Sequence, residues 1–269
     1  MPELPEVETT RRGIEPHLSG QVISGAVVRQ PKLRWPVPDL AKLLVQQRVQ
    51  SVERRGKYLL LRFNNGTLII HLGMSGSLRV LPAATAARAH DHVDLQFGKQ
   101  CLRFHDPRRF GAMLWTDSDP LKHPRLCDLG PEPLSDAFNS DYLYPIARKR
   151  NIAIKSLLMN GHVVVGVGNI YATEALFAAG IHPQRSSHRI SRPRLDRLVV
   201  EVKKILRYAI ERGGTTLRDF LNESGQPGYF AQELMVYGRA GEACKQCGNT
   251  IKTRQIGQRA SAFCPTCQH

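Results

Sequence analysis

The sequence predicts a multidomain α+β protein, because its hydrophobic pattern changes twice along the chain. Residues 1–131 are rich in short β-branched and aromatic segments, residues 132–222 follow a helical period, and residues 237–269 carry two close cysteine pairs. At 269 residues the chain is long enough for two domains with buried cores. We expect a β-sandwich or barrel with one or two flanking helices, then a helical domain and a small terminal module.

The N-terminal part is expected to begin with one short helix and to continue as strands. Asn64-Asn65-Gly66 separates two strand-like segments and is typical of a hairpin turn. The predicted strands cover residues 21–28, 52–63, 67–72, 93–97 and 112–116.

The second part is predicted to be helical. Apolar residues between Leu195 and Ala209 recur at i, i+3, i+4 and i+7, with Ser191 as a candidate N-cap and Gly213-Gly214 as a stop. Residues 223–236 contain Gly225-Gln226-Pro227-Gly228, which breaks this period. We therefore expect an exposed loop and linker before the terminal module.

The charge of the chain calls for an acidic partner. Lys and Arg total 38 against 23 Asp and Glu, which gives a formal net charge of +15. Nucleic acid is the first candidate, because clustered cations release counterions from a phosphate backbone. A membrane surface is disfavoured, since the sequence has no apolar run near ~20 residues and no amphipathic helix with a purely basic polar face. The first residues do not resemble a secretory signal, so we expect a cytoplasmic protein.

Four of the six cysteines form two pairs with the spacing of a zinc site. The pairs enclose 16 residues, and four thiolates at such spacing close a tetrahedral site that leaves no position for water. Two disulfides are the alternative, which a reducing compartment disfavours. Cys101 and Cys127 are expected to be buried thiols. The predicted ligands of one structural zinc ion are Cys244, Cys247, Cys264 and Cys267.

Basic residues lie between the two cysteine pairs. Lys252, Arg254 and Arg259 fall in this stretch, and Glu242 is the one acid between Arg239 and the last residue. A rigid basic hairpin suits contact with a phosphate backbone. An ordinary solvated ribbon is the alternative reading.

The start of the chain offers a nucleophile. If Met1 is removed, Pro2 exposes a secondary amine with a pKa near ~8, whereas a lysine titrates near ~10.4. Attack of this amine on C1′ of a deoxyribose gives an iminium ion, which acidifies C2′ and leads to strand cleavage. Glu3 is one residue away and could transfer protons. Taken alone, an ordinary Met-Pro-Glu start explains the same residues.

Several motifs in register give the chain a specific resemblance. The opening Met1-Pro2-Glu3-Leu4-Pro5-Glu6-Val7-Glu8-Thr9 closely resembles that of formamidopyrimidine-DNA glycosylases, and the similarity spans essentially the whole chain. The further matching motifs are Arg54-Arg55-Gly56-Lys57-Tyr58, His71-Leu72-Gly73-Met74-Ser75-Gly76, His90-Asp91-His92, Asp106-Pro107-Arg108-Arg109-Phe110-Gly111, Gly166-Val167-Gly168-Asn169-Ile170-Tyr171 and the cysteine pairs.

The resemblance implies a fold and four catalytic roles. The expected fold is an N-terminal β-sandwich (1–131), a helix-two-turn-helix domain (132–222) and a C-terminal zinc β-hairpin (237–269). Pro2 would be the Schiff-base nucleophile and Glu3 the proton donor and acceptor. Lys57 would donate a proton in β-elimination, and Arg259 would do so in δ-elimination.

The resemblance also implies DNA contacts. Met74, Arg108 and Phe110 would fill the gap left by an everted nucleotide, with Arg108 facing the orphaned base. His90, Arg150 and Asn169 would contact phosphates, although position 150 is frequently lysine in the family. The loop from Arg218 to Tyr229 would cover the lesion.

The resemblance implies a bifunctional DNA glycosylase and AP lyase that removes oxidised purines from double-stranded DNA. We expect a monomer associated with the nucleoid. Alternatives are an endonuclease VIII-like glycosylase for oxidised pyrimidines, a non-catalytic zinc-ribbon DNA-binding protein and a tautomerase-like enzyme with an N-terminal proline base. The last fits poorly, since the chain is long, basic and predicted to bind zinc.

Overall fold

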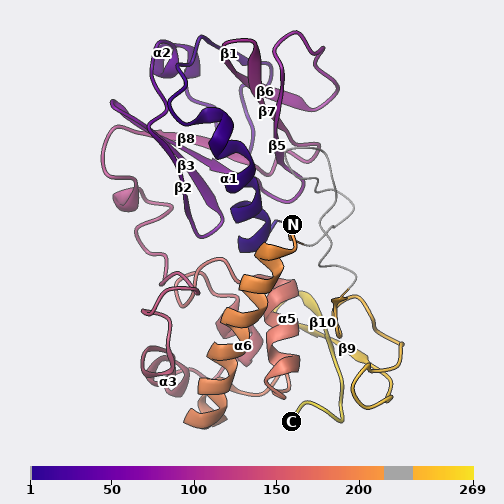
Figure 1. The fold of residues 1–269 in the computed structure, drawn as a ribbon. Helices are drawn as coiled ribbons and strands as arrows, with labels where there is room; N and C mark the ends of the chain where they lie inside the picture. Colours follow the sequence, from indigo (N-terminus) through magenta and orange to yellow (C-terminus); the bar gives the residue numbers. More distant parts are fainter. Residues whose placement is uncertain (1, 215–232) are drawn as a thin grey trace. The chain divides into compact units, whose positions relative to one another are not determined.

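The computed structural model describes residues 2–214 and 233–269, which fall into two compact units. The first unit contains residues 2–127 and 212–214, and the second contains residues 128–211 and 233–269 (Figure 1). Within these described ranges, no helix is both long and apolar enough to cross a membrane.

The first unit combines an opening helix with two antiparallel sheets. Helix α1 spans Leu4–Leu18, and the short helices α2 and η1 span Leu40–Leu44 and Pro120–Lys122. One sheet has the order β1-β6-β7-β5 and the other the order β2-β3-β4-β8. The strands are β1 (Gly25–Val28), β2 (Ser51–Arg55), β3 (Tyr58–Phe63), β4 (Gly66–His71), β5 (Ser77–Pro82), β6 (Asp91–Phe97), β7 (Gln100–His105) and β8 (Ala112–Thr116).

Both sheets contribute to one hydrophobic core, which confirms the expected sandwich. Alternate residues of β3 and β4 are buried together with residues of β6 and β7, and α1 covers the core with Ile14 and Leu18. Each large side chain buried in this way contributes about 1.5–3 kcal/mol. The buried strand residues include Leu59, Leu61, Leu68, Ile70, Val93, Leu95, Leu102 and Phe104.

The strands differ from the expectation in two respects. Residues 52–63 form two strands, because Gly56 takes a φ of +58° and makes a turn between β2 and β3. Strands β5 and β7 were not predicted. In β7 the buried Arg103 breaks the apolar pattern, and Asp94 on β6 accepts two hydrogen bonds of 2.8 Å from its guanidinium. Because a buried ion pair occupies a core position, the hydrophobic pattern of this segment did not predict a strand.

The second unit is mainly helical, as expected. Its helices are α3 (Ser140–Arg148), α4 (Ile154–Leu158), α5 (Asn169–Ala178), η2 (Ser187–Arg189) and α6 (Arg192–Glu211). Helix α6 follows Ser191 and packs its apolar stripe against α5, which also contacts strand β10. Strands β9 (Lys252–Ile256) and β10 (Arg259–Phe263) form an antiparallel hairpin.

One of the two predictions for the unpaired cysteines was wrong. Cys101 is buried on β7, as expected, but Cys127 is exposed. Cys127 lies in a turn that follows η1, where its apolar sequence neighbours do not enclose it.

Candidate functional site

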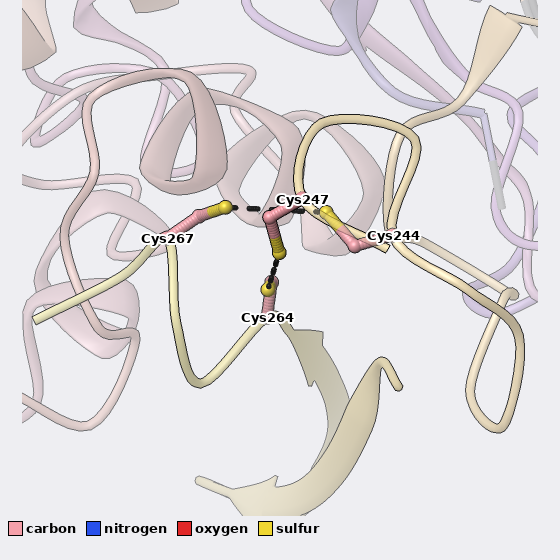
Figure 2. A group of neighbouring side chains, drawn as sticks. All are labelled: Cys244, Cys247, Cys264 and Cys267. Atoms are coloured by element: carbon pink, nitrogen blue, oxygen red, sulfur yellow. Dashed lines mark hydrogen bonds between the residues drawn. The ribbon is translucent and has the colours of Figure 1, made fainter. Parts of the chain in front are cut away.

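The four paired cysteines converge on one point (Figure 2). Their Sγ atoms all lie within 4.8 Å of one another, with 4.0 Å between Cys244 and Cys267 and 3.4 Å between Cys247 and Cys264. Tetrahedral zinc with Zn–S bonds of about 2.3 Å requires sulfur separations of ~3.8 Å. The four thiolates fit this geometry and form a structural zinc site.

The metal matters for the module because its apolar core is small. Phe177 of α5 and the buried Val236, Ile251 and Ala262 pack around Cys244 and Cys264. Small folds with few apolar side chains gain much of their stability from a metal. Zinc therefore orders the hairpin that carries Arg259.

We predict that Cys244→Ser lowers the zinc content well below one ion per chain and weakens DNA binding. Both tryptophans, Trp35 and Trp115, lie in the first unit, so their fluorescence should report an unchanged urea unfolding transition there. Metal analysis and fluorescence are the measurements, and Cys127→Ser is the control. Active wild-type protein without zinc would contradict this assignment.

Pro2 and Glu3 are fixed at the start of α1. Both residues are buried, and Glu3 is only 2% exposed. A capping box joins Glu3 to Glu6: the Glu6 carboxylate accepts the Glu3 backbone N–H at 2.8 Å, and the Glu3 side chain accepts the Glu6 backbone N–H. The helix N-terminus also favours negative charge at these positions. This arrangement holds the peptide that follows Pro2.

The turn that carries Lys57 is tied to α1. Arg54 on β2 donates to Glu8 of α1 at 3.0 Å and to the Gly56 carbonyl at 2.9 Å. Helix α1 packs against β2 and β3, the two strands that this turn connects. The residue next to Lys57 is thus linked through Arg54 to the helix that begins after Pro2 and Glu3.

Glu8 makes this link dependent on pH. Burial raises the pKa of Glu8, but hydrogen bonds from Arg11, Arg12 and Arg54 outweigh burial and lower the pKa to about 2. Its ordinary pKa is 4.5, so the ionised carboxylate stabilises the folded state above pH 4.5. That stabilisation is lost as the pH falls from 4.5 toward 2.

We predict that Glu8→Gln lowers the free energy of unfolding at pH 7 by about 1–2 kcal/mol, and that this deficit shrinks toward pH 3. Urea titrations followed by tryptophan fluorescence at both pH values measure the difference. Glu53→Gln is the control, since this exposed acid of β2 accepts one hydrogen bond from the Ser51 hydroxyl and lies 3.9 Å from Arg62. A deficit that is the same at both pH values would be inconsistent with the link.

His71 lies close enough to Lys57 for the positive charge of Lys57 to lower the pKa of the imidazole. Burial, Lys57 and Arg34, in that order, lower the pKa of His71 to about 4, so the imidazole is neutral at pH 7. Its Nδ1 accepts the Gly73 backbone N–H at 3.0 Å, and its ring lies 4.8 Å from that of Tyr58. His71 therefore anchors the start of the loop that carries Met74.

The residues expected to fill the gap left by an everted nucleotide, Met74, Arg108 and Phe110, are called the wedge residues and lie on two loops of the first unit. Met74 lies between β4 and β5, and Arg108 and Phe110 lie between β7 and β8. Phe110 is 44% exposed, and the Arg108 guanidinium carbon lies 5.3 Å from its ring centroid. An exposed phenylalanine beside an exposed arginine is suited to insertion between bases. His90 precedes β6 and has a φ of +70°, a conformation that non-glycine residues rarely adopt.

In the second unit, Asn169 is connected to the hairpin of Arg259. The Asn169 side chain donates to the Ala260 carbonyl at 3.3 Å and accepts from Lys155 Nζ at 2.5 Å. Lys155 is 1% exposed and also donates to Ser261 Oγ at 2.6 Å. Both hairpin residues belong to β10, which begins at Arg259. The predicted phosphate contact and the predicted δ-elimination residue therefore share one buried support.

Two further expected DNA contacts are Arg150 and the lesion-covering loop. Arg150 is partly buried, and one of its Nη atoms has no hydrogen-bond partner among the residues that the structure describes. The expected lesion-covering loop from Arg218 to Tyr229 lies outside the described residues.

Family models match three consecutive parts of the chain. The formamidopyrimidine-DNA glycosylase N-terminal domain matches residues 1–113, and the H2TH domain of the same enzymes matches residues 129–221. The zinc finger found in FPG and IleRS matches residues 241–269. The chain belongs to the formamidopyrimidine-DNA glycosylase family. The resemblance of its motifs is thereby confirmed.

Full-length relatives support the same membership. The chain is 60% identical to the formamidopyrimidine-DNA glycosylase of Stutzerimonas stutzeri over 100% of both proteins. It is 58% identical to that of Shewanella loihica over 100% of this chain and 99% of the relative. Among solved structures, MutM (FPG) from Thermus thermophilus matches with a TM-score of 0.90 at 37% identity, over 99% of this chain and 98% of that one. Wild-type Lactococcus lactis Fpg, in complex with a DNA containing N7-benzyl-Fapy-dG, matches with a TM-score of 0.92 at 34% identity over all of both chains.

Three supporting residues of this family member were missed by sequence reasoning. Glu6 caps α1, Lys155 supports Asn169, and Asp106 lies among the loops of Met74 and Phe110. The Glu3-x-x-Glu6 spacing was a usable indication of a capping box. Lys155 bonds to Ser261 and Asp106 bonds to Ser75, both distant in sequence, so no local pattern identifies these contacts.

Proposed function

We propose that this chain is a bifunctional DNA glycosylase and AP lyase of base-excision repair, which excises 8-oxoguanine and formamidopyrimidines from duplex DNA. The observation that carries the proposal is the placement of Pro2 and Glu3 at the capped start of α1, in a chain that matches the formamidopyrimidine-DNA glycosylase family along its length. A non-catalytic DNA-binding protein has no use for this N-terminus.

Base removal begins at Pro2 once Met1 has been removed. The pyrrolidine nitrogen attacks C1′ as the glycosidic bond breaks, and its N–H proton passes to Glu3. The departing base takes the bonding electron pair and a proton from water. Opening of the sugar ring at O4′, which receives a proton from Glu3, gives an iminium ion between Pro2 and C1′. The buried position of Glu3 suits such local proton transfer.

Strand cleavage follows from the iminium. It withdraws electrons from C2′, whose proton is lost as the C3′–O bond to the phosphate breaks in β-elimination. Loss of the C4′ proton then expels the 5′ phosphate in δ-elimination, and water releases the sugar fragment from Pro2. Lys57 donates the proton in the first elimination and Arg259 in the second. Cations suit these roles because each leaving group is an anionic phosphate.

DNA contacts come from exposed and basic side chains. Met74, Phe110 and Arg108 occupy the gap left by the everted nucleotide, and Arg108 donates to the O2 and N3 acceptors of the orphaned cytosine. His90, Arg150 and Asn169 bind phosphates. The net charge of +15 provides the salt-dependent part of the affinity.

We also propose a division of labour along the chain. Residues 1–131 carry the glycosylase chemistry, and residues 132–222 bind DNA. Residues 223–236 are the lesion-covering loop and linker, and residues 237–269 bring Arg259 to the DNA on a zinc-ordered hairpin. One chain supplies every group required, so the enzyme acts as a monomer. Its substrate places it at the nucleoid in the cytoplasm.

Single-turnover cleavage of defined duplexes tests this function. We expect 8-oxoguanine to be excised about tenfold or more faster opposite cytosine than opposite adenine, because adenine offers Arg108 no equivalent acceptor pair. Faster cleavage of thymine glycol would instead favour an endonuclease VIII-like specificity. DNA binding without cleavage of either lesion would favour the non-catalytic alternative.

A further inference from the structure

We infer that Asp106 is a positioning residue: its buried carboxylate holds the loops of Met74, Arg108 and Phe110 in one arrangement, and so sets opposite-base selectivity. The inference rests on the proposed function, in which these loops enter the DNA. Asp106 is fully buried at the end of β7, although the side chains of the next four residues are exposed.

The carboxylate connects two loops that are distant in sequence. Its Oδ1 accepts the Ser75 hydroxyl at 2.8 Å, and Ser75 directly follows Met74. Its Oδ2 accepts the Gly111 backbone N–H at 2.7 Å, and Gly111 directly follows Phe110. The Arg108 backbone N–H approaches both Asp106 Oδ1 and Ser75 Oγ at 3.3 Å. Each wedge residue is therefore itself bound to Asp106 or lies next to a residue that is.

The backbone of Asp106 adds a third segment. Its N–H donates to the His90 carbonyl at 3.0 Å, and its carbonyl lies 2.8 Å from His92 Nε2. The Asp106 carbonyl also accepts the Arg109 N–H at 3.2 Å, which closes the turn before Phe110. The segment with the proposed phosphate contact at His90 is thus held to the same residue.

Close backbone packing shows that the two wedge loops fit together tightly. A Cβ added to Gly73 would lie 2.4 Å from the Gly111 nitrogen and 2.4 Å from the Phe110 carbonyl carbon. A Cβ added to Gly111 would lie 2.9 Å from the His71 carbonyl oxygen and 3.0 Å from Asp106 Oδ2. The loops touch through their glycines, so a change in the bonds to Asp106 shifts Met74 and Phe110 relative to each other.

The chemistry of the carboxylate suits this task. Serine O–H and two backbone N–H groups are all donors, and a carboxylate is the side chain that accepts from several directions without donating. Asn has nearly the same shape but replaces one oxygen by an NH₂ group, which cannot accept. Asp106→Asn thus weakens the connection without opening a cavity.

The test compares Asp106→Asn with a matched buried acid. We expect Asp106→Asn to reduce the preference for 8-oxoguanine opposite cytosine over adenine by about tenfold, since a displacement of about 1 Å in a positioned group can change a rate by up to about 100-fold. Ser75→Ala removes one of the bonds and should reduce the same preference by a smaller factor. Asp94→Asn breaks the buried pair with Arg103 and should lower stability while leaving the preference unchanged.

Cleavage of a preformed abasic site provides the second readout. Wild-type trapping by borohydride at that site tests the proposed function itself, independently of Asp106. Loss of selectivity in Asp106→Asn and Ser75→Ala, with abasic-site trapping retained, supports the positioning role. An unchanged preference in both variants, or an equal change in Asp94→Asn, would overturn it. Ser75→Ala keeps the test decisive if Asp106→Asn does not fold.

Discussion

Replacing Pro2 by glycine is expected to slow cleavage of abasic-site DNA by on the order of 100-fold or more. The iminium formed by a secondary amine carries its positive charge at every pH, whereas the imine from glycine must first be protonated to withdraw electrons from C2′. Glycine also removes the pyrrolidine ring that is buried just before α1. Single-turnover strand cleavage and borohydride trapping measure both effects.

Pro5→Ala is the matched control for this variant. Pro5 lies in the first turn of α1, next to the capping box, and offers no amine. Near-wild-type cleavage by Pro5→Ala together with loss in Pro2→Gly assigns the effect to the nucleophile. Full trapping by Pro2→Gly would argue against the secondary amine as the reacting group.

Replacing Arg259 by alanine is expected to separate the two eliminations. Base excision and β-elimination should stay within a few-fold of wild type, while δ-elimination falls by about 100-fold, the usual contribution of a general acid. Arg259 is exposed at the start of β10, so its removal leaves the zinc-ordered hairpin in place. Gel analysis of the 3′ ends distinguishes the two products.

Arg254→Ala serves as the comparison, because Arg254 is an exposed cation of the same hairpin and contacts Gln184. It should weaken DNA binding without changing the ratio of δ to β product. If base excision in Arg259→Ala fell as far as δ-elimination, Arg259 would have a general role in binding.

The fold was predictable where hydrophobic patterns were regular. The apolar stripe of α6 and the apolar, strand-like composition of β4 and β8 gave correct elements, and the predicted Asn64-Asn65-Gly66 turn joins β3 to β4, which begins at Gly66. Strand β7 was missed because Arg103 occupies a core position. Its neutralisation by Asp94 depends on pairing between strands, which no local window contains.

The sequence predicted the site residues that stand in motifs, but it did not predict the residues that hold them in position. Pro2, Lys57 and the cysteines stand in motifs with a recognisable spacing. Asp106 is also in a motif, but its function depends on Ser75 and Gly111, which meet only in the fold. Glu8 and Arg54 likewise bond across 46 positions of sequence.

The most direct measurement is mass spectrometry of the complex trapped by borohydride on a duplex with a single 8-oxoguanine opposite cytosine. We predict that the deoxyribose fragment is found on the nitrogen of Pro2, in an N-terminal peptide that lacks Met1. A fragment attached to Lys57 or to another lysine, or an active enzyme that retains Met1, would contradict the assignment of Pro2 as the nucleophile.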